Sequence, residues 1–225
     1  MKWIITIIVA AVLFIVPAFS ESPIKMATST MSVQEAADML ERLEGKKGAD
    51  VTLTRGILIH NMCAAGKTGR IEEGKQILEN IKSPLSQGYY GSIVTLEGGI
   101  ASKNGNLLKA TQKVQKGFDL IDAAVKNDPE NITLRVLRLE NSLGVVRGSP
   151  FKRDDVLTTD STFLLGKAAI QPAEVQAHIY YLAGDAAFEI GNLNDAFVYL
   201  ENAIRSDPKS VYARKADDLL WQLEE

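Results

Sequence analysis

The sequence predicts an all-α protein made of helical hairpins, with about ten helices and no sheet. Two segments of the chain, one beginning at Lys116 and the other at Asp195, resemble each other. Each contains an amphipathic helical pattern, an Asp-Pro pair and a second helical pattern. One supersecondary unit used twice is typical of a repeat architecture. The rest of the chain also fits helical spacing, with apolar residues three or four positions apart.

The two Asp-Pro pairs mark expected helix starts. Asp128 and Asp207 occupy the N-cap position, because a carboxylate there accepts hydrogen bonds from free N–H groups of the next helix. Pro129 and Pro208 then fall at the first helical position, where the missing N–H of proline breaks no hydrogen bond. We therefore expect the last helix over residues 208–223, as a capping helix that shields the final hairpin from solvent.

Other boundary signals predict helices in the rest of the chain. Ser32 and Glu35 form a capping box before an amphipathic run. Gly66 can end one helix with a positive φ, and Thr68 can cap the next. The stretches "QGYYGSIVTLEGGIASKN" and "TTDSTFLLGKAAI" are further helical candidates. We expect the loop from Arg147 to Asp154, with the charges that follow it, to be solvated and to separate two sub-blocks.

A motif of large and small residues spans residues 177–210. Small side chains at Gly184, Ala196 and Ala203 let two helices approach closely, while larger ones fill the remaining space. The order and spacing of these residues resemble the tetratricopeptide repeat (TPR) motif, although Ala187 and Leu200 depart from it. The similarity is partial around residues 98–130 and weak at 55–85. The matching positions are Tyr180, Ala183, Gly184, Ala196, Leu200, Ala203 and Pro208.

This resemblance implies a TPR-like solenoid over residues 32–225, in which the first helix of each hairpin lines a concave groove. It also implies a scaffold that binds a protein or peptide partner by shape and charge complementarity, without catalysis. Aromatic residues in this groove can instead belong to the core between repeats. Carried onto the best repeat, 177–210, the groove positions are His178, Tyr181, Asp185, Phe188 and Glu189.

The first 20 residues have the pattern of a signal peptide. Lys2 supplies the positive end, and an apolar run from Trp3 to Val16 follows it. Pro17 ends this run, and small residues such as Ala18 and Ser20 suit a cleavage site. We therefore expect cleavage after Ser20.

Cleavage at this point predicts an exported protein, located in the periplasm, in the cell envelope or in the medium. Residues 21–31 are then a flexible linker before the helical domain. The alternative is an uncleaved anchor, which would make the protein a membrane-tethered accessory subunit of an envelope complex. The apolar run is short for this role, since a membrane span needs about 20 residues.

The composition of the chain disfavours several other functions. Its 225 residues carry a formal net charge of −3, which does not suit a nucleic-acid partner. Cys63 is the single cysteine, so an intramolecular disulfide is impossible. His60 lies three positions before it, but two ligands are too few for a metal site. We therefore expect no cofactor and no metal.

The sequence Gly66-Lys67-Thr68 raises the alternative of a nucleotide-binding enzyme, because Gly-Lys-Thr ends a phosphate-binding loop. That motif requires glycine five positions before the Gly-Lys pair, where this chain has Asn61. We interpret the three residues as a turn between two helices. A small-molecule binder with an apolar cavity between helices also remains open.

Overall fold

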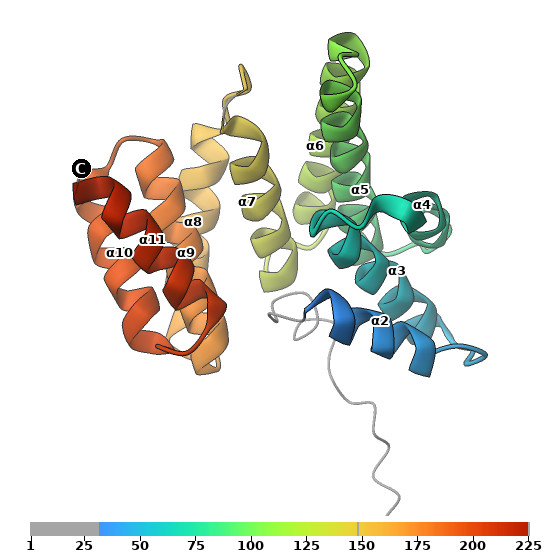
Figure 1. Ribbon diagram of the computed structural model, residues 1–225, viewed down its shortest axis with the longest axis horizontal. Coiled ribbons are helices and arrows are strands. Elements are labelled where there is room, and N and C mark those ends of the chain that lie inside the picture. Colours follow the sequence, from blue (N-terminus) through green and yellow to red (C-terminus); the bar gives the residue numbers. More distant parts are fainter. Residues whose placement is uncertain (1–31, 148, 225) are drawn as a thin grey trace, which may run out of the picture.

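The computed structural model describes residues 32–147 and 149–224, so the predictions for residues 1–20 and 21–31 lie outside the described chain. The described part contains ten α-helices, one short 3-10 helix and no strand, which confirms the all-α prediction (Figure 1). None of these helices combines the length and the hydropathy that crossing a membrane requires. The helices are α2 (Val33–Arg42), α3 (Ala49–Ala64), α4 (Ile71–Glu79), α5 (Pro84–Lys103), α6 (Leu107–Asn127), α7 (Ile132–Val146), α8 (Asp154–Ala168), α9 (Ala173–Glu189), α10 (Leu193–Ser206) and α11 (Val211–Glu224), and the 3-10 helix is η1 (Thr68–Arg70).

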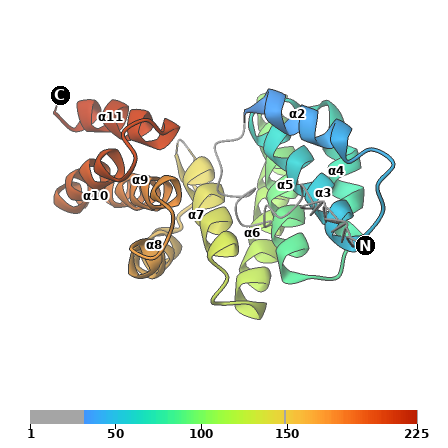
Figure 2. The ribbon, with the colours of Figure 1, turned by 90° about the horizontal axis from the view of Figure 1, so that it is seen from below.

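The helices pack as consecutive hairpins along the chain. After α2, which packs on α3, the pairs are α3 with α4, α5 with α6, α7 with α8, and α9 with α10, and α11 packs last. In Figure 2, α2 to α6 lie at one end of the molecule, α7 follows them, and α8 to α11 lie at the other end. The first helix of each pair also contacts the first helix of the next pair. Helices α3, α5, α7, α9 and α11 therefore form one continuous layer.

The hydrophobic core continues through consecutive hairpins. One cluster joins Leu139 of α7, Leu157 of α8 and Ile179 of α9, all almost fully buried. Helix α7 also contacts α5 and α6 on its other side. The core therefore runs past the Arg147–Asp154 connection, where a break between sub-blocks was predicted.

Local signals set several helix ends as the sequence predicts. Glu35 N–H donates to Ser32 Oγ at 3.2 Å and Ser32 N–H donates to Glu35 Oε2 at 2.7 Å, so the capping box is present. Gly66 (φ +88°) and Gly191 (φ +80°) follow α3 and α9 in the left-handed region that favours glycine. Thr68 does not cap α4 as predicted. It starts η1, and α4 begins at Ile71 without a side-chain cap.

The Asp-Pro pairs start turns, and the prediction that they start helices is wrong. Asp128 and Asp207 end α6 and α10 as C-caps, and the next helices begin about one turn later. Leu134 N–H donates to Asn131 Oδ1 at 3.2 Å, and Ala213 N–H donates to Ser210 Oγ at 3.0 Å. Asn131 and Ser210 are therefore the N-terminal caps. The last helix is Val211–Glu224 rather than 208–223.

The best-matching hairpin shows the close approach that its small residues predict. A Cβ atom built on Gly184 of α9 would lie 2.7 Å from Leu200 Cγ and 3.2 Å from Leu200 N on α10. Ala196, Leu200 and Ala203 of α10 have no exposed surface. The missing side chain at Gly184 therefore makes room for Leu200 between the two helices.

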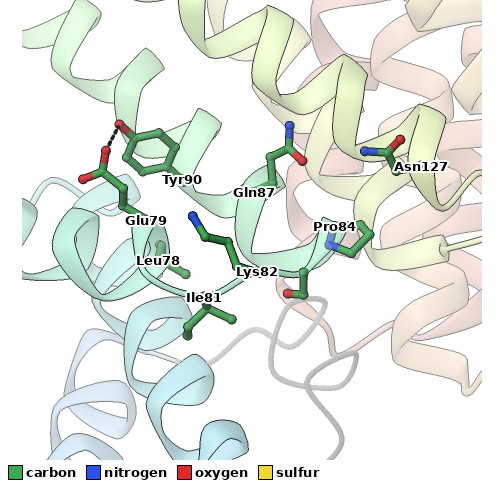
Figure 3. Close-up of a pocket in the computed structure, with 9 residues that line it drawn as sticks. Leu78, Glu79, Ile81, Lys82, Pro84, Gln87, Tyr90 and Asn127 are labelled. Atoms are coloured by element: carbon green, nitrogen blue, oxygen red, sulfur yellow. Dashed lines mark hydrogen bonds between the residues drawn. The ribbon is translucent and has the colours of Figure 1, made fainter.

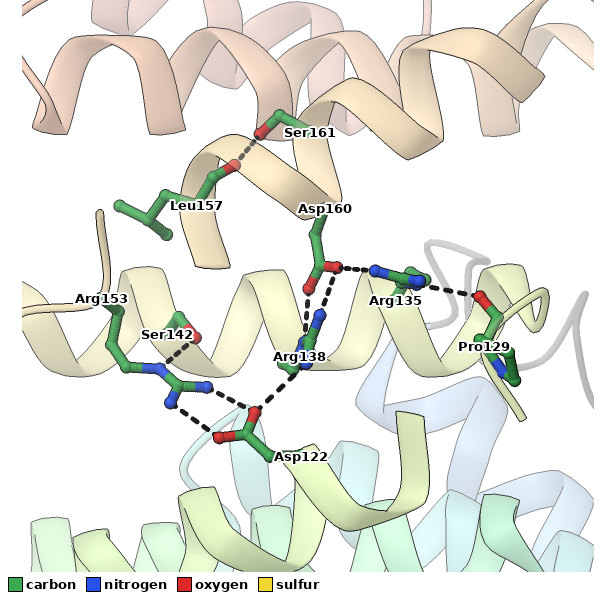
Figure 4. A network of polar contacts seen from close by, with 9 residues as sticks. All are labelled: Asp122, Pro129, Arg135, Arg138, Ser142, Arg153, Leu157, Asp160 and Ser161. Atoms are coloured by element: carbon green, nitrogen blue, oxygen red, sulfur yellow. Dashed lines mark hydrogen bonds and ion pairs between the residues drawn. The ribbon is translucent and has the colours of Figure 1, made fainter. Parts of the chain in front are cut away.

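A charge network joins three successive helices and the loop that was predicted to be solvated (Figure 4). Asp160 of α8 has no exposed surface and accepts hydrogen bonds from Arg135 and Arg138 of α7. Arg138 also contacts Asp122 of α6 at 3.4 Å. Arg153 donates two hydrogen bonds to Asp122, at 2.7 and 2.8 Å.

The network corrects the prediction of a solvated loop for Arg153, whereas Lys152 is exposed as expected. The Arg153 guanidinium lies 4.4 Å from the centroid of the Phe118 ring, so the aromatic face and Asp122 hold it together. Burial raises the pKa of Asp122, but the hydrogen bonds and charges of Arg153 and Arg138 outweigh burial and lower the pKa below its usual value. Arg153 therefore fixes the end of the loop against α6.

Candidate functional site

Four of the five predicted groove residues line one pocket between α9 and α11. The pocket has a volume of about 550 Å³. It lies against the continuous layer of first helices, because α9 and α11 both belong to this layer and contact each other. The predicted residues that line it are Tyr181, Asp185, Phe188 and Glu189, and they are joined by Arg147, Lys215, Asp218, Leu219 and Gln222.

Arg147 holds the two carboxylates of α9 that face the pocket. It follows the last residue of α7, and its Nε donates to Glu189 Oε1 at 2.6 Å while Nη2 donates to Asp185 Oδ1. Burial raises the pKa of Asp185, and the charge and hydrogen bond of Arg147 oppose this effect. The Arg147 side chain is 52% exposed although it makes both ion pairs.

Tyr181 of α9 and Lys215 of α11 also line the pocket, and Tyr212 of α11 lies beside them. Tyr181 of α9 and Tyr212 of α11 stack with ring centroids 6.0 Å apart. Lys215 Nζ lies 5.6 Å from the Tyr181 centroid and 5.5 Å from the Tyr212 centroid, within cation–π range. Burial and the charge of Asp185 raise the pKa of Tyr181 to about 12, so its hydroxyl stays protonated at neutral pH.

The structure places the fifth predicted residue, His178, away from this pocket. Its side chain is 1% exposed, and its ring stacks on Tyr212 with centroids 3.8 Å apart. Its Nε2 lies 2.9 Å from Glu140 Oε1 of α7. His178 therefore joins α7, α9 and α11 beneath the surface, and α11 covers it.

The pocket residues outside α9 were missed by the sequence analysis. The four on α11 are Lys215, Asp218, Leu219 and Gln222. Their spacing of three, four and seven positions is that of one helical face, so treating this helix as part of the groove would have identified them. No local sequence pattern predicts that Arg147 lines the pocket, because its partners, Asp185 and Glu189, lie 38 and 42 positions further along the chain.

A second set of polar side chains links α3, α5 and α7 in the core. His60 Nε2 lies 2.8 Å from Ser92 Oγ, and His60 Nδ1 lies 2.9 Å from Asn61 Oδ1. Asn141 Nδ2 also donates to Ser92 Oγ, at 3.0 Å. A serine hydroxyl next to a histidine, which in turn contacts an amide, is also the arrangement of a catalytic nucleophile and its base. Here, however, Ser92 and His60 are buried, and neither lines the pocket between α9 and α11 or the pocket between α4 and α5. These contacts join α3, α5 and α7, so His60 has a structural role here.

We expect His60 to make the protein less stable as the pH falls below 6.5. Burial lowers the pKa of His60 below its usual 6.5, while Asn61 and Glu140 oppose this effect. The folded state therefore favours neutral imidazole. The stabilisation that neutral His60 gives is complete above pH 6.5, and it is lost as the pH falls toward the pKa of His60 in the folded protein. The loss for one proton is at most about 1.4 kcal/mol per pH unit.

Urea unfolding at pH 7.5 and pH 5.5 measures this loss. His60→Gln removes the titrating ring and keeps a hydrogen-bonding group, so its unfolding free energy should depend much less on pH. The same pH dependence in the wild type and in His60→Gln would assign the effect to another group.

The Gly66-Lys67-Thr68 segment forms the turn that the sequence analysis favours. The residues before it form α3, not the strand that a phosphate-binding loop follows. Lys67 N–H donates to Met62 O at 2.9 Å, which closes the end of α3. Cys63 in the same helix is 2% exposed, and burial raises the pKa of its thiol.

Another pocket, of about 440 Å³, lies at the connection between α4 and α5 (Figure 3). Tyr90 Oη donates to Glu79 Oε1 at 3.1 Å on one side of it. Asn127, at the end of α6, lies on the other side in Figure 3. None of the predicted groove residues lines this pocket, and the sequence analysis did not predict it.

The described residues contain no cluster of three or more histidine, cysteine or acidic side chains that could hold a metal ion. The pocket between α9 and α11 places aromatic, aliphatic and charged side chains next to one another. Comparisons of the chain with protein-family models, with curated proteins and with solved structures find no match.

Proposed function

We propose that the protein is an exported TPR-like scaffold, which binds a segment of another protein in the pocket between α9 and α11 and does not catalyse a reaction. One observation carries this proposal. Tyr181, Asp185, Phe188 and Glu189, the groove positions implied by the TPR resemblance, line one pocket with residues of the next first helix.

The chemistry of the pocket suits a peptide with both apolar and charged side chains. Tyr181, Phe188 and Leu219 supply apolar surface, and aromatic residues are frequent anchors in protein interfaces. Within residues 32–147 and 149–224, Lys215 and Asp218 make no ion pair. They lie one helical turn apart on α11 and can pair with an acidic and a basic side chain of the ligand.

The arrangement of the helices supports the same proposal. Successive first helices, from α3 to α11, contact one another and present a continuous layer on which an extended or helical segment can lie. Arg147 fixes the carboxylates of Asp185 and Glu189, so the wall of the pocket is formed before the ligand arrives. A preformed site reduces the entropy lost on binding.

Photo-crosslinking tests the proposed groove. A photoreactive phenylalanine analogue at Gln222, which lines the pocket, should crosslink a partner in the native envelope or medium. Tyr181→Ala and Lys215→Glu should each lower the yield, because an interface anchor typically contributes enough to change affinity by about tenfold. The crosslinked segment, identified by mass spectrometry, can then be synthesised and its affinity measured.

Lys209, exposed in the turn before α11, provides the matched control. The same analogue at Lys209 should capture little of that partner, and Lys209→Glu should leave its affinity unchanged. An affinity that Tyr181→Ala and Lys215→Glu do not alter would place the binding site elsewhere. A bound small molecule released from the purified protein, without any protein crosslink, would favour the small-molecule alternative.

A further inference from the structure

The turn between α5 and α6 presents two adjacent leucines to solvent. Leu107 is 67% exposed and Leu108 is 73% exposed, although both are large aliphatic residues. Lys109 N–H donates to Asn106 Oδ1 at 3.1 Å, so a side-chain cap fixes the start of α6 directly beneath the leucines. The leucines are therefore held on an ordered helix end.

The same turn is a projecting part of the molecule. Helices α5 and α6 are the longest described, with 20 and 21 residues, and the turn between them stands clear of α4 and α7 in Figure 1. The exposed leucines at this projecting turn do not need a preformed pocket in order to be buried. The turn can enter a surface that deforms around it, as the interface of a lipid bilayer does.

The residues that form the tip and the adjoining turns of α5 and α6 carry only positive charges. Residues 98–117 include four lysines and no aspartate or glutamate. Lys113 pairs with Glu97 at 2.6 Å, whereas Lys103, Lys109 and Lys116 are exposed. These three make no ion pair with any other described residue. The tip therefore concentrates positive charge on a chain whose formal net charge is −3.

The turn between α9 and α10 offers an internal comparison. It has the same residue order, Gly191-Asn192-Leu193 against Gly105-Asn106-Leu107, and Leu193 is 52% exposed. Its nearest charged residues along the chain, Glu189 and Asp195, are acidic. An exposed leucine after this type of turn therefore occurs with either sign of charge, and only the α5–α6 tip combines it with lysines.

We propose that the α5–α6 tip binds an anionic lipid surface. Leu107 and Leu108 enter the boundary between headgroups and acyl chains, and Lys103 and Lys109 contact the anionic headgroups. Aliphatic insertion together with basic residues is the combination that gives reversible membrane attachment, because each signal alone is weak. This proposal does not depend on the groove between α9 and α11, which lies on other helices.

An environment-sensitive dye at the tip tests this proposal in the full chain. Leu107→Cys can be labelled selectively, because the single native cysteine, Cys63, is buried. Vesicles of equal parts phosphatidylglycerol and phosphatidylcholine should shift the dye emission to the blue, and vesicles of phosphatidylcholine alone should not. Added salt should reduce the shift, because it screens the lysines.

Variants of the unlabelled chain identify the groups that bind. The double variants Leu107→Ser/Leu108→Ser and Lys103→Glu/Lys109→Glu should each weaken sedimentation with the anionic vesicles by about tenfold or more. Leu193→Ser replaces one exposed leucine at the equivalent acidic turn and should bind like the wild type. All substituted side chains are exposed, so circular dichroism should show unchanged helix content.

Three results would overturn the proposal. One is equal sedimentation of the wild type and both double variants. A second is sedimentation without a dye shift, which would assign attachment to the N-terminal segment shared by every variant. A third is a dye shift produced by a protein fraction and not by anionic vesicles, which would make the tip a protein-binding surface.

Discussion

Replacing Asp160 by alanine is expected to destabilise the protein by about 3–5 kcal/mol. Asp160 has no exposed surface and accepts hydrogen bonds from Arg135 Nη1 at 2.8 Å and from Arg138 Nε and Nη2 at 2.7 Å each. The side chains of these arginines are only 13% and 12% exposed. Without Asp160, two guanidinium groups remain close to the core with much of their charge uncompensated.

Urea unfolding followed by circular dichroism measures this effect. Asp217→Ala is the matched control, because it deletes an exposed carboxylate in the middle of α11. Substitutions at such surface positions typically change the unfolding free energy by less than about 0.5 kcal/mol. A loss below about 1 kcal/mol for Asp160→Ala would mean that water reaches the arginines easily in the variant.

The sequence could not predict the charge network around Asp160 and Asp122, because its paired residues lie far apart in the chain. Arg138 and Asp160 are 22 positions apart, and Arg153 and Asp122 are 31 positions apart. Helical spacing relates residues only within a few turns of one helix, so it contains no information about such pairs. The basic loop therefore resembled a solvated surface until the packing of α6, α7 and α8 was known.

The helices themselves could be predicted, because their signals are local. The Ser32 capping box and the glycines at 66 and 191 act within one turn of the residues that they position. The Asp-Pro pairs failed for a local reason too. Each precedes a second capping residue, Asn131 or Ser210, by three positions. The later cap starts the helix, and the Asp-Pro pair starts the turn before it.

The candidate groove shows the same limit. Tyr181, Asp185 and Phe188 lie four and seven positions apart, so they share one face of α9 and line the pocket together. His178 lies on that face one turn earlier, yet Tyr212 of α11 covers its ring. The helical period gives the direction of a side chain, but only the neighbouring helix decides whether that side chain is accessible.

Replacing Leu200 by alanine is expected to destabilise the protein by about 2–5 kcal/mol, because it opens a cavity between α9 and α10. Leu200 is fully buried and fills the space above Gly184, where a Cβ atom would lie 2.7 Å from Leu200 Cγ and 2.8 Å from Leu200 Cδ2. Gly184→Ala in the wild-type background should also destabilise, by about 1–3 kcal/mol, because the hairpin is already closely packed.

The two changes should partly compensate when they are combined. In Leu200→Ala, the space left by Cγ and Cδ2 can hold the methyl group that Gly184→Ala introduces, so the double variant should be more stable than the sum of the single losses predicts. Contacting residues typically couple by about 0.5–3 kcal/mol. Thermal and urea unfolding of the four proteins gives this coupling energy directly.

Gly99→Ala is the control for the helical glycine, since a Cβ atom there meets nothing within 4 Å. It should stabilise α5 by up to about 1 kcal/mol, and its effect should add to that of Leu200→Ala. Additive losses for Gly184→Ala and Leu200→Ala would contradict the packing described here. Compensation would show that Gly184 is required for the leucine opposite it, and that this spacing of small and large residues sets the distance between the two helices.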